Sequence, residues 1–541
     1  MGGIIGKLSF DRLVSPFDET YAGTSDARNI RAVADAQLIN ADELRDMLES
    51  GGHRFSARTD AELIAHAYDR WGTRAFERLR GAFTCAIWDE PNRRLVLARD
   101  HVGIRSLYFM VLDGQQFVFA SDIRALVRDP AVARDWCAEG IDTYLALGYI
   151  PAPLTAYRQI SKLQAAHCLL VEGRRLHLEE YWDFPTPRTT TRCGSSTAVA
   201  ACLRNACRHE LKGQDQKALL YSGGIASSAL LSVAPPTSGI AWTLQVDQHP
   251  PELARSDAAA SMLGRVRELE TLERPVVSLL ETLAATNGEP FADPSALTHL
   301  AICTAAARRA NVALTGHGAA ILWGGQDRPR LFSAVWDDSR RRSIYTRRFA
   351  WKIRDTNPFS WHLERWKSRV DDAPNDRVRY VNARTLLPDN VLAIAANASQ
   401  AAGISLRFPF VDYQMTELAM ETPVAVSCRG GVEMHTVRQL LAARVSRRLL
   451  PAASQRPARQ SWLPSVLRAL VPTMLLGPRF DARDIVSRPA LRRLWKDHLS
   501  GRADHARRLW SLLMLEFWFR EFIDGDAAAE PLEYAVLVKA A

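Results

Sequence analysis

The sequence predicts two large domains: an α+β domain built mainly from antiparallel strands, and then an α/β domain with a parallel sheet. The chain has 541 residues, whereas single hydrophobic cores stop growing at roughly 250–300 residues. Short apolar runs alternate with turn residues in the first part of the chain, as in antiparallel sheets. A later apolar run ends in a glycine-rich turn that enters a helix, which is typical of a parallel α/β sheet.

The composition predicts a globular protein of the cytoplasm with no membrane partner. Hydrophobic residues make up 47% of the chain and charged residues 24%, and no apolar run approaches the ~20 residues that a spanning helix needs. The segment Met1–Phe10 lacks a basic region followed by a long apolar core, and Gly6 stands where a myristoylation signal has Ser or Thr. We therefore expect neither export nor anchoring.

Cysteine and charge patterns exclude two further classes. The 8 cysteines form no C-x-x-C pair and have no histidines at zinc spacing, so we expect reduced thiols. The formal net charge is +9, but no nucleic-acid motif accompanies it, and no nucleic-acid partner is expected. A basic stretch, Arg340–Arg354, contains Tyr345, Phe349 and Trp351; a solvated helix face is favoured there over a docking surface for an acidic peptide.

Two strand pairs define the first domain. The runs Ala82–Trp88 and Leu95–Ala98 flank a turn with Asp, Pro and Asn, which predicts a β-hairpin. A second pair, Leu107–Leu112 and Gln116–Ala120, surrounds an Asp-Gly turn. The segment Asp60–Arg70 has apolar residues at helical spacing.

The composition shifts to Pro, Thr, Gly and Ser between Pro185 and Ser196, which predicts a domain boundary. We assign residues 1–185 to the first domain, 186–196 to a linker and 197–541 to the second domain. Beyond the linker we expect these elements in order: a helix over Ala198–Arg208, a strand over Lys217–Tyr221, a helix from about Ser227 and a strand over Asn311–Thr315.

The most informative string follows the strand Lys217–Tyr221. It consists of Ser222, Gly223 and Gly224, then Ile-Ala, then Ser227 and Ser228. Glycines allow the backbone to approach an anion closely, and the N–H groups at the start of a helix attract phosphate. The lysine of a Walker A loop is absent. Taken alone, the string could also be a tight turn of small residues.

This string resembles the pyrophosphate loop Ser-Gly-Gly-x-Asp-Ser-Ser of the asparagine-synthetase family. Further segments agree with the family in order, namely Arg99–Tyr108, Leu147–Thr155, Tyr181-Trp182, Glu289–Ser295, Leu314–Ala320 and Arg407–Asp412. The resemblance implies a class-II glutamine-amidotransferase-like sandwich followed by an adenine-nucleotide alpha-hydrolase-like synthetase domain, with ATP and Mg²⁺ as cofactors. The nucleotide-binding residues it implies are Ser222, Gly223, Gly224, Ser227, Ser228, Thr315, Gly316 and Gly318.

The first domain departs from that pattern at its reaction centre. Glutamine-using relatives have a cysteine after the initiator methionine as nucleophile, whereas this chain has Gly2. The family's Asn-Gly-Glu segment, which helps to hold glutamine, is replaced by Ala34–Gln37. We therefore expect no release of ammonia from glutamine.

A synthetase without glutaminase chemistry resembles the lasso-peptide cyclases and β-lactam synthetases of this family. That resemblance implies adenylation of a side-chain carboxylate in a ribosomal precursor peptide, followed by capture by the peptide's N-terminal amine. A leader-processing protease is a second implied partner. The alternatives are an asparagine synthetase that uses free ammonia, a β-lactam-synthetase-like enzyme, and an inactive paralogue that binds a peptide or a partner protease.

The second domain departs from the family at the expected metal ligands. The aspartate of the first loop is replaced by Ala226, and the Asp-Glu of the second loop by Ala320 and Ile321. In the family these carboxylates are expected to hold Mg²⁺ against the pyrophosphate. Losing one such group costs on the order of 10²–10³ in rate, so turnover by this chain should be strongly reduced.

Three other residues are candidates for roles at the site. Arg459 is our candidate for electrostatic stabilisation of the transition state, in place of the family's late lysine. Arg407 is a second catalytic candidate, although a structural pair with Asp412 is the favoured interpretation. His317 could offer a cation or a ligand to phosphate, but a histidine on the surface of the loop is favoured.

Overall fold

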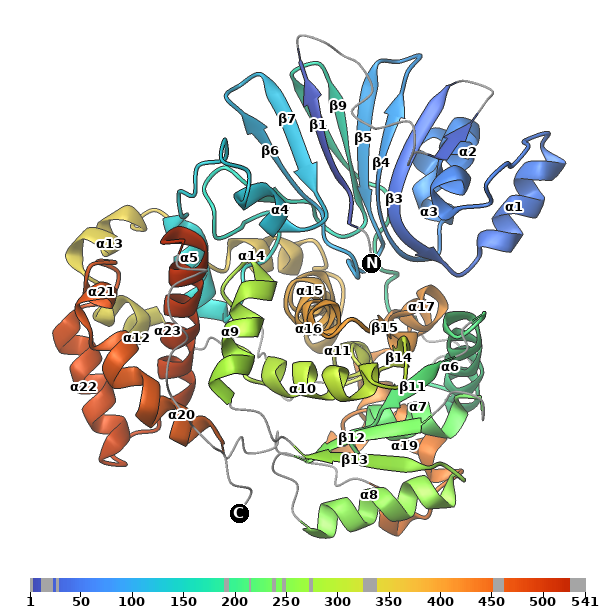
Figure 1. The fold of residues 1–541 in the computed structure, drawn as a ribbon. Helices are drawn as coiled ribbons and strands as arrows, with labels where there is room; N and C mark the ends of the chain where they lie inside the picture. Colours follow the sequence, from blue (N-terminus) through green and yellow to red (C-terminus); the bar gives the residue numbers. More distant parts are fainter. Residues whose placement is uncertain are drawn as a thin grey trace. The chain divides into compact units, whose positions relative to one another are not determined.

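The computed structural model describes residues 3–10, 23–25, 29–188, 194–213, 216–235, 240–245, 250–271, 276–324, 338–450 and 462–525. The chain forms two compact units (Figure 1). Unit 1 comprises Met1–Asp135, Pro151–Pro185 and Leu387–Ala393, and unit 2 comprises Trp136–Ile150, Thr186–Leu386 and Ile394–Ala541. Each unit therefore includes a short segment from a distant part of the sequence. The linker at 186–196 stays a prediction, because residues 189–193 lie outside the described residues.

Unit 1 contains two antiparallel sheets. One has the strand order β1-β7-β6-β8, and the other has the order β10-β9-β5-β4-β3-β2. The strands are β1 (Ile5–Ser9), β2 (Gly23–Ser25), β3 (Ile30–Leu38), β4 (Gly81–Asp89), β5 (Arg94–Arg99), β6 (Tyr108–Leu112), β7 (Gln116–Ala120), β8 (Ser161–Lys162), β9 (His167–Glu172) and β10 (Arg175–Glu180).

Both predicted strand pairs are confirmed. Strands β4 and β5 are antiparallel neighbours, with Asp89 opposite Arg94 beside the turn, and β6 pairs antiparallel with β7. The segment Ala34–Gln37, where the resemblance led us to expect the family's Asn-Gly-Glu, lies inside β3 and pairs with β4.

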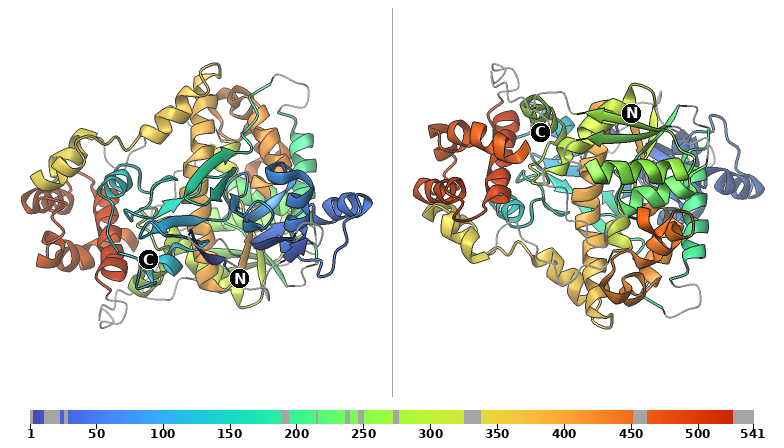
Figure 2. Two further views of the ribbon diagram at one scale, coloured as in Figure 1. Left: turned by 90° about the horizontal axis from the view of Figure 1, so that it is seen from above. Right: turned by 90° about the horizontal axis from the view of Figure 1, so that it is seen from below.

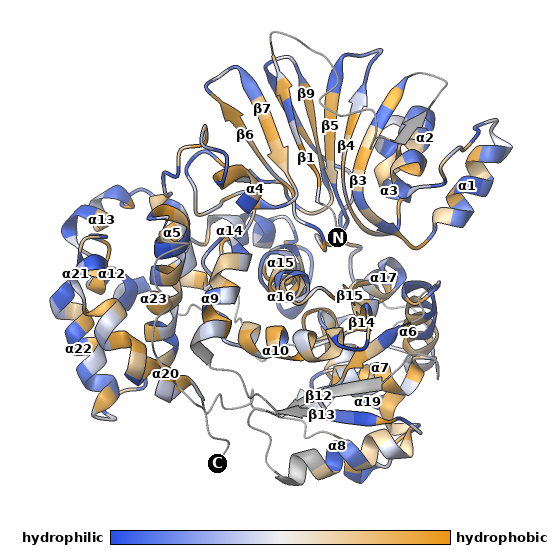
Figure 3. Ribbon diagram, viewed as in Figure 1, coloured by the Kyte–Doolittle hydropathy of each residue, from blue (hydrophilic) through white to orange (hydrophobic). Residues whose placement is uncertain are grey.

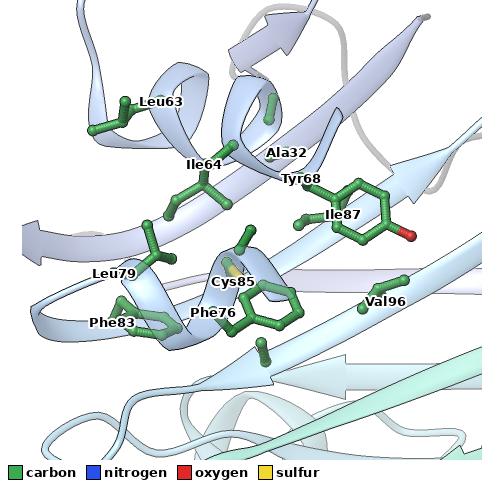
Figure 4. Close-up of a cluster of buried hydrophobic side chains, with 14 of the residues drawn as sticks. Ala32, Leu63, Ile64, Tyr68, Phe76, Leu79, Phe83, Cys85, Ile87 and Val96 are labelled. Atoms are coloured by element: carbon green, nitrogen blue, oxygen red, sulfur yellow. The ribbon is translucent and has the colours of Figure 1, made fainter. Parts of the chain in front are cut away.

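Strand β4 supplies side chains to a different core on each of its faces. Ala86 and Trp88 lie in a cluster with Leu8, Phe117 and other residues of the first sheet. Alternate residues on the opposite face, such as Cys85 and Ile87, pack under the helices of unit 1 (Figure 4). Since successive side chains of a strand point to opposite faces, a strand covered on both sides is apolar along most of its length, as the colouring of the middle of β4 and of β5 shows (Figure 3).

Helix α2 covers the second sheet through Leu63, Ile64 and Tyr68 (Figure 4). It spans Asp60–Trp71 and confirms the helix predicted from apolar spacing. The other helices of unit 1 are α1 (Ala41–Ser50), α3 (Ala75–Arg78) and α4 (Ile123–Val127).

Unit 2 is built on a parallel sheet of five strands in the order β13-β12-β11-β14-β15. The strands are β11 (Lys217–Leu220), β12 (Ile240–Gln245), β13 (Arg267–Thr271), β14 (Val312–Leu314) and β15 (Ser405–Arg407). The predicted parallel α/β sheet is thus confirmed. Because β12 and β14 lie on opposite sides of β11, the strand order reverses at β11, which is the position where doubly wound sheets bind ligands.

The first helices of unit 2 are α5 (Ala138–Leu147), α6 (Ser196–Glu210), α7 (Ile225–Val233), α8 (Pro250–Met262), α9 (Val276–Asn287), α10 (Ser295–Ala307) and α11 (Ala319–Leu322). They are followed by α12 (Asp338–Ile344), α13 (Arg347–Lys352), α14 (Ser360–Lys367), α15 (Pro374–Arg384), α16 (Ala393–Ala402), α17 (Tyr413–Glu421), α18 (Val424–Ser427) and α19 (His435–Ala442). The last are α20 (Trp462–Leu470), α21 (Pro478–Asp481), α22 (Arg488–Leu499) and α23 (Ala506–Trp518), which gather in one cluster in every view (Figures 1 and 2).

The basic stretch Arg340–Arg354 is only in part the solvated helix face that the sequence predicts. Arg341 is fully buried, and its Nε lies 2.9 Å from a carboxylate oxygen of Asp142. The hydroxyl of Tyr345 donates to the same oxygen at 2.7 Å. Trp351, by contrast, is 66% exposed. A buried ion pair therefore replaces solvent at the centre of this stretch, a feature that composition alone does not reveal.

Across the described part of the chain, no helix is both long enough and apolar enough to span a bilayer.

Candidate nucleotide-binding site

The candidate site lies at the carboxyl ends of β11, β14 and β15 in unit 2. Neighbouring parallel strands end at the same edge of the sheet, so the loops that follow them meet there. The first loop runs from Ser222 to Gly224 and enters α7 at Ile225. The second loop runs from Thr315 to Gly318 and enters α11 at Ala319. The structure thus brings together the two glycine loops that the sequence singled out.

The first loop is closed by short polar contacts. The backbone N–H of Ser222 donates to Oγ of Ser227 at 3.3 Å, and the two hydroxyls lie 3.1 Å apart. The hydroxyl of Ser227 also donates to the carbonyl of Gly224 at 3.2 Å. Gly224 is the N-cap of α7, and no side chain caps this helix. The first N–H groups of a helix have no partner within it, so this end of α7 can bind an anion.

Gly223 is required by its conformation and by its surroundings. Its φ is +72°, in the left-handed region that disfavours residues with a Cβ. A Cβ at this position would lie 2.1 Å from Oγ of Ser256 on α8. Tyr221, at the end of β11, donates a hydrogen bond from its hydroxyl to the carbonyl of Ser256 at 3.1 Å. Helix α8 therefore packs against the first loop through Ser256. No motif in the sequence around Ser256 predicts this contact.

The second loop lies against the first. A Cβ added at Gly316 would lie 3.0 Å from Cβ of Ala226 and 3.2 Å from the backbone nitrogen of Ser227. Gly318 has φ +86° and precedes α11. The close approach explains why small residues occupy both loops, and it places Ala226 at their contact.

A pair of histidines in contact with each other lies beside the second loop. Nδ1 of His317 is 2.5 Å from Oγ1 of Thr315, and its Nε2 is 3.0 Å from Nε2 of His299 on α10. Burial lowers the pKa of His317 well below its ordinary value of 6.5, and the neighbouring His299 lowers it further. Burial also lowers the pKa of His299, although Asp293 opposes this. Both shifts oppose the suggestion that His317 offers a cation to phosphate, which stays a prediction.

Arg407 and Asp412 flank the site at the end of β15. The carbonyl of Arg407 accepts a hydrogen bond from the N–H of Thr315 at 3.0 Å, and its Nε lies 4.0 Å from a carboxylate oxygen of Glu210. Asp412 caps α17 by accepting from the N–H groups of Gln414 and Met415. The catalytic role of Arg407 stays a prediction, and Arg459 lies outside the described residues, as does Gly2.

The residues at the expected carboxylate positions of the two loops do not fit a magnesium ion. The positions at which the family places carboxylates carry the methyl groups of Ala226 and Ala320 and the buried side chain of Ile321. Within the described ranges, no group of three or more His, Cys, Asp and Glu side chains could hold a metal ion. Mg²⁺ prefers oxygen ligands, and carboxylates above all, so we derive no chemical step through it.

The Arg99–Tyr108 segment, which matches the family in unit 1, has a structural role. Arg99 is 1% exposed, and its guanidinium donates to the carbonyls of Gly103, Arg105 and Leu163. It also lies 3.7 Å from the buried carboxylate of Asp389. Arg99 thus holds together the backbone at Gly103, Arg105 and Leu163 within unit 1.

The fold and the two loops define a nucleotide-binding α/β protein. A parallel sheet whose central strand ends in a glycine loop and an uncapped helix is typical of sites for phosphate groups. Residues 198–520 match the model of the asparagine synthase family, and residues 24–182 match that of the glutamine amidotransferase domain. The chain therefore belongs to the asparagine synthase family and carries an amidotransferase-like domain at its N-terminus.

Similar proteins share most of this length at low identity. The chain is 22% identical to asparagine synthetase [glutamine-hydrolyzing] 1 of Bacillus subtilis, over 93% of this chain and 87% of that protein. It is 23% identical to a putative asparagine synthetase of Mycobacterium bovis, over 92% and 85% of the two chains. Amidase chry2 of Gibberella zeae is also 23% identical, over 76% of this chain and 73% of its own.

Proposed function

We propose that this chain is an ATP-dependent amide-bond-forming ligase that acts on a peptide and closes an isopeptide macrolactam of the lasso type. The supporting observation is the combination of an intact pair of glycine loops in unit 2 with Gly2 in place of the glutaminase nucleophile. A chain that keeps the nucleotide loops but obtains no ammonia from glutamine needs another amine. An amine of the substrate itself meets that need.

The proposed chemistry has two steps. A side-chain carboxylate of the precursor attacks the α-phosphorus of ATP, and the bond to pyrophosphate breaks. The N-terminal amine then attacks the acyl carbon, loses its proton and expels AMP. In this chain the uncapped start of α7, with Ser222 and Ser227, binds the polyphosphate. A cytoplasmic location and a partner protease that removes the leader complete the proposal.

A second candidate function is that of a non-catalytic paralogue that binds nucleotide and peptide. The specific observation in its favour is that Ala226, Ala320 and Ile321 occupy the positions of the family's acidic residues. Without those groups the charge on departing pyrophosphate lacks its usual stabilisation, and each such loss costs on the order of 10²–10³ in rate.

ATP–pyrophosphate exchange distinguishes these functions. We expect the Ala226→Asp/Ala320→Asp variant to exchange label in the presence of a candidate precursor peptide and to yield a product lighter by one water. The unmodified chain should exchange far more slowly. Adding two carboxylates at exposed sites outside the two loops, Ala131→Asp and Ala482→Asp, is the matched control and should not raise exchange.

Two results would count against the macrolactam proposal. Formation of asparagine from aspartate, ammonia and ATP by either form would instead indicate an ammonia-dependent asparagine synthetase. If the restored variant shows no exchange with any peptide of the same gene neighbourhood but still binds ATP, the non-catalytic paralogue is favoured.

A further inference from the structure

The two loops of the candidate site carry neutral groups where the family carries charged ones. Ala226 is half-buried at the contact with Gly316, and Ala320 is exposed at the start of α11. The polar groups around the first loop include the hydroxyls of Ser222 and Ser227, the hydroxyl of Ser256 on α8 and the N–H groups that begin α7. All of these can donate a hydrogen bond, and none is an anion.

Two carboxylates on neighbouring elements already have protein partners. Asp412 accepts from the N–H groups of Gln414 and Met415 at the start of α17. Asp293 accepts from the N–H of Ser295 at 2.9 Å and lies close to His299. These contacts hold each carboxylate at the start of its own helix. Neither Asp412 nor Asp293 therefore takes the place of the carboxylates that are absent at positions 226 and 320.

These observations change how the site should respond to a divalent cation. Carboxylates beside a polyphosphate repel it, since like charges a few ångströms apart interact strongly away from bulk water. A bridging metal converts that repulsion into attraction. When the carboxylates are absent, the metal has no protein ligands to bridge to, whereas the helix start and the hydroxyls still attract the anion.

We propose that this site binds ATP as the metal-free polyphosphate, without any need for a divalent cation. The proposal rests on the nucleotide site of the proposed function and specifies the form of its ligand. It also gives the two alanines a consequence that can be measured without turnover: the affinity for ATP should be nearly the same in EDTA as in Mg²⁺.

Calorimetric titration of the full chain with ATP, in EDTA and in excess Mg²⁺, tests this directly. We expect the two dissociation constants to agree within about threefold, a difference of less than 1 kcal/mol. In the Ala226→Asp/Ala320→Asp variant, binding in EDTA should weaken by about tenfold or more, and Mg²⁺ should recover it. The Ala131→Asp/Ala482→Asp control adds the same charge at exposed positions and should behave like the unmodified chain.

The possible outcomes separate the two proposals. Tighter binding by about tenfold or more in Mg²⁺ by the unmodified chain would overturn metal-free binding while leaving the nucleotide site in place. Equal affinities in the Ala226→Asp/Ala320→Asp variant would also overturn it, because the two positions would then not control the metal. Absence of ATP binding in both conditions would overturn the nucleotide site itself, and the proposed function with it. A circular dichroism melt of each variant confirms that the comparison is made on folded protein.

Discussion

Helix α2 of unit 1 and helix α7 of unit 2 are anchored alike but begin differently. Both bury apolar residues: Leu63 and Ile64 of α2 lie in the core beside β3, and Leu230 and Leu231 are buried on α7, which packs against α6 and α19. The hydroxyl of Thr59 caps α2 by accepting from the N–H of Glu62, whereas α7 begins at Gly224 with no side-chain cap.

The difference separates a structural helix start from one that is open to a ligand. Around α2, the carboxylate of Glu62 accepts from the N–H groups of Ser56, Ala57 and Arg58, so side chains satisfy the turn before the helix. At α7 no side chain caps the helix, so its first N–H groups can bind an anion.

The largest expected effect concerns the core beneath α2. Phe83→Ala should lower the free energy of unfolding of unit 1 by about 3–5 kcal/mol, since it removes a large apolar side chain and leaves a cavity. Phe83 is fully buried in the cluster that joins β4 to α2 and α3 (Figure 4). Denaturant unfolding followed by circular dichroism measures the loss. Phe83→Leu keeps most of the volume and should cost less; equal losses for both variants would contradict a well-packed core.

The next effect tests the open start of α7. Gly223→Ala places a Cβ at φ +72° and 2.1 Å from Oγ of Ser256. The strain costs about 1–2 kcal/mol and the clash adds to it, so ATP affinity should fall by about tenfold to a hundredfold. Gly403→Ala is the matched control, because Gly403 has φ +73° but nothing within 4 Å of the added Cβ. Equal loss of ATP binding in both variants would show that backbone strain alone, without the contact to α8, explains the effect.

The two strand pairs and helix α2 of unit 1, and the strand–loop–helix unit of the site, could be predicted because their signals are local. The run at β4 and β5 carries its turn residues within it, and the first loop carries its glycines and serines beside an apolar strand. Strands β13 and β15 gave no comparable signal. The first reads Arg-Glu-Leu-Glu-Thr and the second has only three residues, so both owe their pairing to neighbours distant in sequence.

The parts of the site that escaped prediction depend on contacts between distant segments. Ser256 supports the first loop from a helix whose sequence has no turn or glycine signal. His299 contacts His317 from α10, 18 residues earlier in the chain, and burial of both rings lowers their pKa values. Arginine is usually exposed, but Arg341 is buried against Asp142, a partner 199 residues away in the sequence. Residue type alone could not reveal these contacts.

The smallest expected effect tests the closed start of α2. Burial raises the pKa of Glu62, but hydrogen bonds donated by Ser56, Arg58 and Ala57 outweigh it and hold the pKa below its ordinary value of 4.5. A lowered pKa in the folded state means that the stabilisation is present above pH 4.5 and is lost as the pH falls through the folded pKa. In the Glu62→Gln variant, the amide NH₂ would replace one of the two carboxylate oxygens and would face backbone N–H groups that it cannot accept from. We therefore expect the free energy of unfolding to fall by roughly 1–2 kcal/mol at pH 7.

That loss should shrink towards zero at low pH, where the carboxylate of the unmodified chain is itself protonated. Denaturant unfolding of both forms at a series of pH values from 7 downwards measures the difference. Glu43→Gln removes an exposed carboxylate from the first turn of α1 and is the matched control, with an expected change within about 0.5 kcal/mol. If the difference in the free energy of unfolding between the unmodified chain and Glu62→Gln does not vary with pH, the shape of the Glu62 side chain, rather than its charge, stabilises the start of α2. The contrast with α7 would then rest on the Thr59 cap alone.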